Sequence, residues 1–227
     1  MKKSKKYILT SITLLAIVLM TTINAEAQKK VEFGIRYMPN ISSFDMKTSS
    51  GGTVSGTATL GHGVGAFLGF NFTDNFGIQG EIIYNSFSQK YKDMDVEQQV
   101  NLKYVNIPLL LSLNTGKSRI VNLNIVAGPQ IGISVGSSIN TSGNNGTYSS
   151  NASLSIKKSD FGFAYGGGLD FGINPSRTIR LGLGYRGVVG LVDISNNSQT
   201  TSTDSYYIVE KTHLKSNSGY IGLSIMF

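Results

Sequence analysis

The chain has 227 residues, of which 15 % are charged and 40 % hydrophobic, with 27 Gly, 11 Tyr and 11 Phe but neither Trp nor Cys. Without cysteine the chain can form no disulfide, thiolate metal site or lipoprotein anchor. Its mean hydropathy of 0.00 excludes a polytopic helical membrane protein, which needs several apolar runs of about 20 residues. The basic residues are scattered, so nucleic acid is not an expected partner.

Residues 1–27 have the three parts of a secretory signal peptide. Four lysines lie within residues 2–6, an apolar run extends to Ile23, and Ala25-Glu26-Ala27 matches a small-residue cleavage site. We therefore expect export through the Sec pathway and cleavage after Ala27, which leaves residues 28–227 as a single mature domain. The alternative is a retained anchor helix. Cleavage would lower the formal net charge from +7 to +4.

From Gln28 onward, apolar residues recur at every second position, which indicates β-strands. Residues 161–173 show this best, because mostly bulky apolar side chains alternate there with mostly glycine and alanine. The same pattern predicts eight strands, at about 31–41, 61–73, 75–87, 99–114, 119–135, 159–174, 177–191 and 210–227.

The connections between these strands alternate in length. Short ones lie around Asp74, at 115–118 and at 174–176, whereas 42–60, 88–98, 136–158 and 192–209 are long. Up-and-down transmembrane barrels have this layout, with short periplasmic turns and long extracellular loops. We therefore predict an all-β fold: an eight-stranded antiparallel up-and-down transmembrane β-barrel in the bacterial outer membrane, with both termini in the periplasm.

The two faces of the predicted strands have opposite chemistry. The bulky face suits lipid, and the glycine-rich face suits the interior of an eight-stranded barrel, which is just wide enough for side chains to fill. Three acids and three bases are expected to point inward: Glu32, Arg36, Glu81, Asp170, Arg180 and Arg186. Because unpaired buried charges are costly, the balanced set predicts a salt-bridged plug and not an open pore. The alternative is that some of these groups are hydrated at strand ends.

Two further features concern the strands themselves. Pro108 cannot donate to a strand ladder, so it predicts a β-bulge or an irregular strand end, and a change of apolar parity near Tyr104 and Val105 favours the bulge. The residues expected to supply interfacial aromatic side chains are Tyr37, Phe70, Phe72, Phe76, Tyr84, Tyr165, Phe171, Tyr185 and Phe227.

Several stretches together resemble the PorT-type outer-membrane β-barrel family of Bacteroidetes-like bacteria. They are LKYVNIPLLL at 102–111, FGIR and PNISS within 33–43, GVGAF at 63–67, QGEIIY at 79–84, AGP at 127–129 and YIGLSIMF at 220–227. The resemblance implies an outer-membrane barrel and, by analogy with one relative, a link to a protease-exporting secretion system. It implies no catalytic residue. Phe227 looks like the C-terminal signal that the barrel assembly machinery reads.

No motif predicts catalysis, a cofactor or a metal. The spelling G-x-G-x-x-G at 182–187 lies inside a strand pattern and lacks the helix that dinucleotide binding requires. Gly116-Lys117-Ser118 lacks the upstream glycine of a P-loop and is interpreted as a charged periplasmic turn. The two histidines show no zinc-ligand spacing. A catalytic group at the rim is a minor alternative, with candidates His62, His213, Asp93, Asp95, Asp193, Asp204 and Ser205.

The function expected from the sequence is therefore a non-enzymatic barrel with a structural, binding or secretion-associated role. Its expected partners are outer-membrane lipid, the assembly machinery during biogenesis, and a secretion-system or surface partner at the long loops. The stretches 137–155 and 195–205, rich in Ser, Asn, Gly and Thr, favour flexible surface cover over a defined binding site. A narrow porin and a soluble secreted lipocalin-like barrel are the alternatives.

Overall fold

The computed structural model describes residues 31–43, 46–47, 53–54, 57–93, 96–143, 146–150, 158–192 and 214–227. The predicted signal peptide and the rim candidates Asp95, Asp193, Asp204, Ser205 and His213 lie outside these residues. The strands of the described part are β1 Val31–Ser43, β2 Met46–Lys47, β3 Thr53–Val54, β4 Thr57–Asn71, β5 Phe76–Asp93, β6 Val96–Asn114, β7 Val121–Gly143, β8 Gly146–Ser150, β9 Ser159–Gly172, β10 Ile179–Gly190 and β11 Lys215–Met226.

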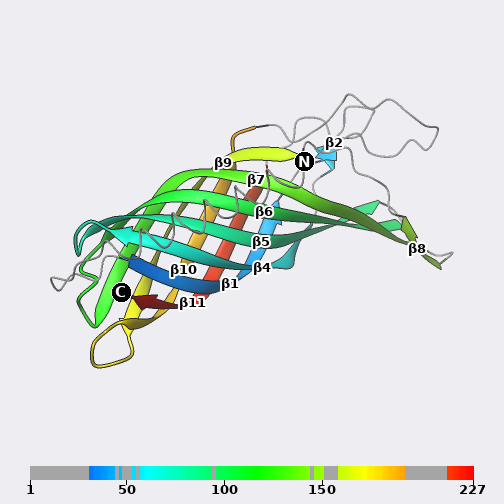
Figure 1. Cartoon of the computed structure of the whole chain (residues 1–227). Helices are drawn as coiled ribbons and strands as arrows, with labels where there is room; N and C mark the ends of the chain where they lie inside the picture. Colours follow the sequence, from blue (N-terminus) through cyan, green and yellow to red (C-terminus); the bar gives the residue numbers. More distant parts are fainter. Residues whose placement is uncertain are drawn as a thin grey trace, which may run out of the picture.

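Eight of these strands close into an antiparallel barrel (Figure 1), in the order β1, β4, β5, β6, β7, β9, β10 and β11. The first and last strands of the chain close the ring, with Phe33 opposite Ile225. At its end, the amide of Phe227 donates to the carbonyl of Val31 at 2.8 Å. Closure pairs both edges of the sheet, as hydrocarbon requires of a spanning β-protein. The predicted fold class is confirmed.

The barrel is apolar outside and polar inside. On β1, Phe33 and Ile35 are 46 % and 56 % exposed, whereas Glu32 and Arg36, at positions of the opposite parity, are 3 % and 8 % exposed. A water-soluble barrel has the reverse arrangement, so the exterior is suited to lipid. The nine aromatic side chains named from the sequence all lie outside, Phe171 being half-buried and the other eight exposed. No helix among the described residues has the length and apolarity needed to cross a bilayer.

Two of the predicted long loops are largely strand, and that part of the loop prediction was wrong. β5 continues to Asp93 and β6 begins at Val96, while β7 continues to Gly143 and pairs with β8. Together these strands extend beyond one side of the barrel (Figure 1). Backbone pairing does not depend on side-chain polarity, so it continues where the apolar alternation has ended. The region expected to be flexible cover is thus partly an ordered sheet.

The structure has a β-bulge near Tyr104, as predicted, but its cause differs from the one predicted. Lys103 lies opposite Gly136 and Tyr104 opposite Ser134, so Val135 of β7 is the extra residue. The parity of β6 does not change, because both Tyr104 and Asn106 remain buried. The apparent change of parity instead marks where the barrel interior becomes apolar, beside the buried Phe87, Val100, Leu102 and Tyr104. Pro108 lies opposite Gln130 with no register shift.

Candidate functional site: the charged interior of the barrel

All six charged residues that the sequence places inside the barrel are buried there. Two more buried charged side chains, Lys117 and Asp160, join them, so the described part of the chain buries four acids and four bases. Their contacts divide most of them into two groups along the barrel. We name these the central cluster (Arg36, Glu81 and Arg186) and the turn-end cluster (Glu32, Lys117, Asp170 and Arg180), which lies at the end of the short turns.

Glu81 is the centre of the central cluster. Its Oε1 accepts from Arg36 Nη1 at 2.6 Å and from Arg186 Nη2 at 2.9 Å, and its Oε2 accepts from Arg186 Nη1 at 3.1 Å. Gln79 Nε2 also donates to Oε1. These charge-assisted hydrogen bonds compensate for the loss of water around the carboxylate. One carboxylate thus ties β1 and β10 to β5 across the barrel interior.

Aromatic rings fill the space beside this cluster. The guanidinium carbon of Arg36 lies 4.1 Å from the centre of the Phe67 ring and 4.8 Å from that of Tyr220, both within cation–π range. Glycine makes room for the second ring, since a Cβ atom at Gly184 would lie 2.5 Å from Tyr220 Cζ. The glycine-rich face predicted from the sequence therefore accommodates specific large side chains.

In the turn-end cluster, Lys117 bridges two acids. Its Nζ lies 2.7 Å from Glu32 Oε2 and 3.5 Å from Asp170 Oδ2. Ser224 Oγ donates to Glu32 Oε1 at 2.7 Å, and Asn122 Nδ2 donates to Asp170 Oδ2 at 3.0 Å. The sequence interpretation of Lys117 as part of a charged turn missed this role, since the residue is only 4 % exposed. Turn residues do not follow the strand parity that identified the other inward charges.

Arg180 uses its guanidinium differently from the two arginines of the central cluster. Its Nη1 donates to the carbonyl oxygens of Lys117 and Arg119 at 3.0 and 3.1 Å, and its Nη2 donates to that of Asp170 at 3.0 Å. The amide of Gly116 donates to Asn122 Oδ1 at 3.1 Å. Arg180 thus holds the turn between β6 and β7 in the mouth of the barrel, and its acceptors are backbone groups and not a carboxylate.

Neutral side chains fill the barrel interior between the two charged clusters. Asn124 Nδ2 donates to Ser112 Oγ at 2.8 Å and to Asn114 Oδ1 at 2.9 Å. Beside them, Leu110, Val126 and Ala164 form a buried apolar group with Val188 packed against it. Buried polar groups normally have hydrogen-bond partners, and these amides find theirs in neighbouring side chains of the interior. At this level the interior is therefore filled by mutually bonded amide and hydroxyl side chains and by an adjoining apolar group.

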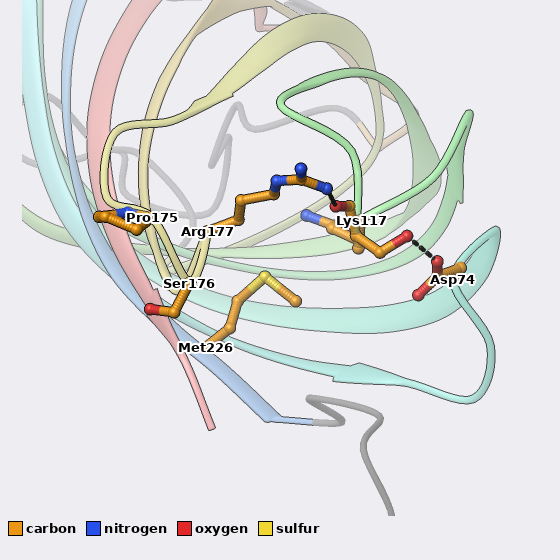
Figure 2. Close-up of a pocket in the computed structure, with 7 residues that line it drawn as sticks. Asp74, Lys117, Pro175, Ser176, Arg177 and Met226 are labelled. Atoms are coloured by element: carbon orange, nitrogen blue, oxygen red, sulfur yellow. Dashed lines mark hydrogen bonds between the residues drawn. The ribbon is translucent and has the colours of Figure 1, made fainter.

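A cavity of about 240 Å³ lies outside this packed region at the short turns (Figure 2). Ser118 Oγ donates to the carboxylate of Asp74, and Arg177 Nη1 donates to the carbonyl of Ser118 at 2.7 Å. Pro175, Ser176 and Met226 complete the lining with Lys117. Within the described ranges, no three His, Cys, Asp or Glu residues gather as metal ligands. The cavity is thus a polar depression formed by turns of three different strand pairs.

The rim histidine that the structure describes does not complete a catalytic group in this part of the chain. His62 lies on β4 with an exposed side chain, opposite Ser86 of β5. Asp93 is the last residue of β5. The remaining rim candidates lie outside the described residues, so within the described part of the chain the set is not brought together.

Residues 24–196 match a family model described as an outer membrane protein beta-barrel domain. The chain belongs to this family. The match spans most of the barrel, so the lipid-suited exterior described above is that of an outer-membrane protein. No curated protein matches the chain.

Solved structures of outer-membrane proteins have a similar fold. OprG from Pseudomonas aeruginosa is 15 % identical, with a TM-score of 0.54 over 88 % of this chain and 97 % of that chain. Neisserial surface protein A is 12 % identical, with a TM-score of 0.43 over 86 % and 97 %. Ail of Yersinia pestis is 14 % identical, with a TM-score of 0.40 over 86 % and 99 %. The similarity of this chain to OprG supports the fold alone.

Proposed function

We propose that this outer-membrane barrel is non-enzymatic and non-conducting, and that it acts through a structural or binding role at the membrane surface. The observation that carries the proposal is the obstruction of its interior at two levels. Glu81 is hydrogen-bonded to two arginines in the central cluster, and Lys117 is bonded to Glu32 in the turn-end cluster. An ion would have to replace several of these buried charge-assisted bonds to pass.

The proposed orientation has the short turns and both termini in the periplasm. The extension formed by β5, β6, β7 and β8 then projects from the outer surface, where loops and strands on a rigid barrel commonly carry binding. A secretion-associated, PorT-like role would use this extension as its contact surface. The resemblance of residues 102–111 to that family is what supports this more specific role.

Conductance in planar bilayers tests the non-conducting role. We expect no discrete channels from the wild-type protein and measurable ones from a variant that removes the bonds at both levels and carries Glu81→Ala, Arg186→Ala, Glu32→Ala and Lys117→Ala. The variant shows that the assay detects an opened barrel, and its folding is checked by heat-modifiable gel migration. Stable, reproducible channels from the wild-type protein would overturn the proposal in favour of a narrow porin.

Membrane fractionation and cysteine labelling test location and orientation. The native chain has no cysteine, so Ser138→Cys on β7 and Ser176→Cys in a short turn each provide one reactive thiol. In intact cells, a membrane-impermeant maleimide is expected to label Ser138→Cys only. Labelling of Ser176→Cys alone would indicate the opposite orientation, with the short turns at the cell surface. A monomer that is fully soluble without detergent would contradict the membrane location.

A further inference from the structure

Two opposite charges border the cavity at the short turns without pairing with each other. Asp74 belongs to the turn between β4 and β5, and Arg177 to the turn between β9 and β10 (Figure 2). Within the described ranges, neither side chain forms an ion pair. Each instead has one side-chain hydrogen bond to Ser118, which lies between them. The cavity is therefore lined by an acid and a base that do not neutralise each other.

Ser118 shows what kind of group can bridge the two charges. Its hydroxyl donates to Asp74 Oδ2, and its carbonyl oxygen accepts from Arg177 Nη1 at 2.7 Å. Asp74 Oδ1 and Arg177 Nη2 have no partner among the described residues. An α-amino acid has an ammonium donor and a carboxylate acceptor on one carbon, so it too places a donor and an acceptor a few bonds apart. The two remaining atoms can therefore bind a free amino acid in the way that the bonded atoms bind Ser118.

The turns hold both charged residues in place. The amide of Arg177 donates to the carbonyl of Asn174 at 2.9 Å, and the amide of Lys117 donates to that of Asp74 at 3.0 Å. Arg177 has a φ of 55°, the only positive φ of a non-glycine residue in the described part of the chain. Its surroundings leave room for this conformation, because a Cβ atom at Gly172 would lie 3.1 Å from Arg177 Cβ. Strained backbone of this kind persists where the neighbouring structure fixes it, and it is common at ligand sites.

The size and charge of the cavity restrict the class of ligand. Its volume of about 240 Å³ is smaller than the roughly 300–1,000 Å³ of sites for drug-sized ligands. A simple anion would meet the like charge of Asp74, and a simple cation would meet that of Arg177. Met226 adds an apolar surface to the lining. A small dipolar molecule with a short side chain therefore matches the cavity better than an ion of either sign.

We propose that this cavity binds a free α-amino acid, with its ammonium group on Asp74 and its carboxylate on Arg177. A short side chain of the ligand contacts Met226. The cavity lies outside the packed interior and at the end of the barrel opposite the β5–β8 extension. The inference therefore does not depend on the proposed surface role or on the orientation in the membrane.

The test titrates the isotope-labelled full chain in detergent micelles and follows the amide of Ser118 by two-dimensional NMR. The probes are L-alanine, N-acetyl-L-alanine without the ammonium group, L-alanine amide without the carboxylate, and L-alanyl-L-alanine, whose charges are farther apart. We expect L-alanine to bind most tightly. Arg177→Gln and Asp74→Asn should each weaken its binding about tenfold, the low end for a hydrogen bond to a charged group.

Arg119→Gln is the matched control, because Arg119 is an exposed base of the neighbouring turn and does not line the cavity. Its effect on alanine binding should be no more than about twofold. Asp74→Asn keeps an acceptor for the Ser118 hydroxyl, so the turn contact is retained. This variant should bind N-acetyl-L-alanine as tightly as L-alanine, a change of preference that general loss of structure would not produce. Heat-modifiable gel migration checks the folding of each variant.

Three results would overturn the proposed site. They are equal binding of alanine and its two blocked derivatives to the wild-type chain, unchanged alanine binding in Asp74→Asn and Arg177→Gln, and an equal loss in Arg119→Gln. Equal binding of the dipeptide would also contradict it, because the spacing of the two charges would then be immaterial. Channels in planar bilayers would count against the proposed non-conducting role and leave these results unaffected, so the two failures are distinguishable.

Discussion

Glu81 and Arg186 are 105 residues apart in the chain, yet their side chains form two hydrogen bonds of 2.9 and 3.1 Å inside the barrel. Their strands, β5 and β10, are separated by β4, β1 and β11 in the sheet order. They therefore face each other from opposite walls. The pair braces the full width of the barrel, and Arg36 joins it from β1 between them.

Replacing Glu81 by Gln should strongly destabilise the barrel. The change removes the only carboxylate to which Arg36 and Arg186 have described ion pairs, and loss of one partner of a buried pair costs about 3–5 kcal/mol. The measurement is the urea unfolding midpoint in lipid vesicles. The matched control Asp74→Asn, in a short turn, should cost less than about 1 kcal/mol. Adding Arg186→Gln to Glu81→Gln should restore part of the loss. An unchanged midpoint in Glu81→Gln would show that the pair does not stabilise the barrel.

Replacing Lys117 and replacing Arg119, two basic residues of one turn, should change the free energy of unfolding by different amounts. Lys117→Met leaves Glu32 and Asp170 without their ammonium partner, so we expect a loss of about 3 kcal/mol or more in unfolding free energy. Arg119→Met is the control, because that side chain is exposed and lies two residues away. Its effect should stay within about 0.5 kcal/mol. Equal effects of the two variants in the same urea titration would count against the buried bridge.

A larger residue at Gly184 should displace the Tyr220 ring. The first carbon of a Val side chain would lie 2.5 Å from Tyr220 Cζ and 2.5 Å from the backbone carbonyl oxygen of Gly167, so both the ring that lies beside Arg36 and the neighbouring strand β9 must shift. Overpacking of this kind costs about 1–3 kcal/mol. Near-ultraviolet circular dichroism and the unfolding midpoint report the change. Combining Gly184→Val with Tyr220→Ala should relieve the clash with the ring but not the one with the Gly167 carbonyl, so part of the loss should be recovered. Simple additivity of the two substitutions would disprove the contact with the ring.

Charge on the outer wall should be costly in proportion to its depth. Leu109 lies midway along the apolar face of β6, and Leu113 lies near its end; both are exposed. For lipid-facing sites, arginine costs about 2–4 kcal/mol at the bilayer midplane and about 0–1 kcal/mol near the interface. Leu109→Arg should therefore destabilise the barrel more than Leu113→Arg in vesicles. Neutral effects at both positions would indicate an exterior that faces water.

Side-chain alternation was sufficient to predict the closed fold and the inward direction of residues such as Glu81 and Arg186. It could not identify Lys117, because a turn residue is placed by the path of the turn and not by strand parity. Nor could it identify the acceptors of Arg180, since backbone carbonyls are present at every position. The polar ends of β5, β6 and β7 were missed because strands beyond the apolar zone lose the alternation while keeping their backbone pairing.

The seam between β1 and β11 determines when the barrel interior can be completed. Glu32 and Arg36 lie on β1, whereas Ser224 and Tyr220, which contact them, lie on β11. During insertion, both edge strands keep unpaired backbone groups until the last strand arrives. A chain shortened before β11 would lack these contacts and retain two open edges, a form prone to pairing with other chains. The contacts between β1 and β11 that fill the interior therefore form only in the closed barrel and are absent from an open sheet.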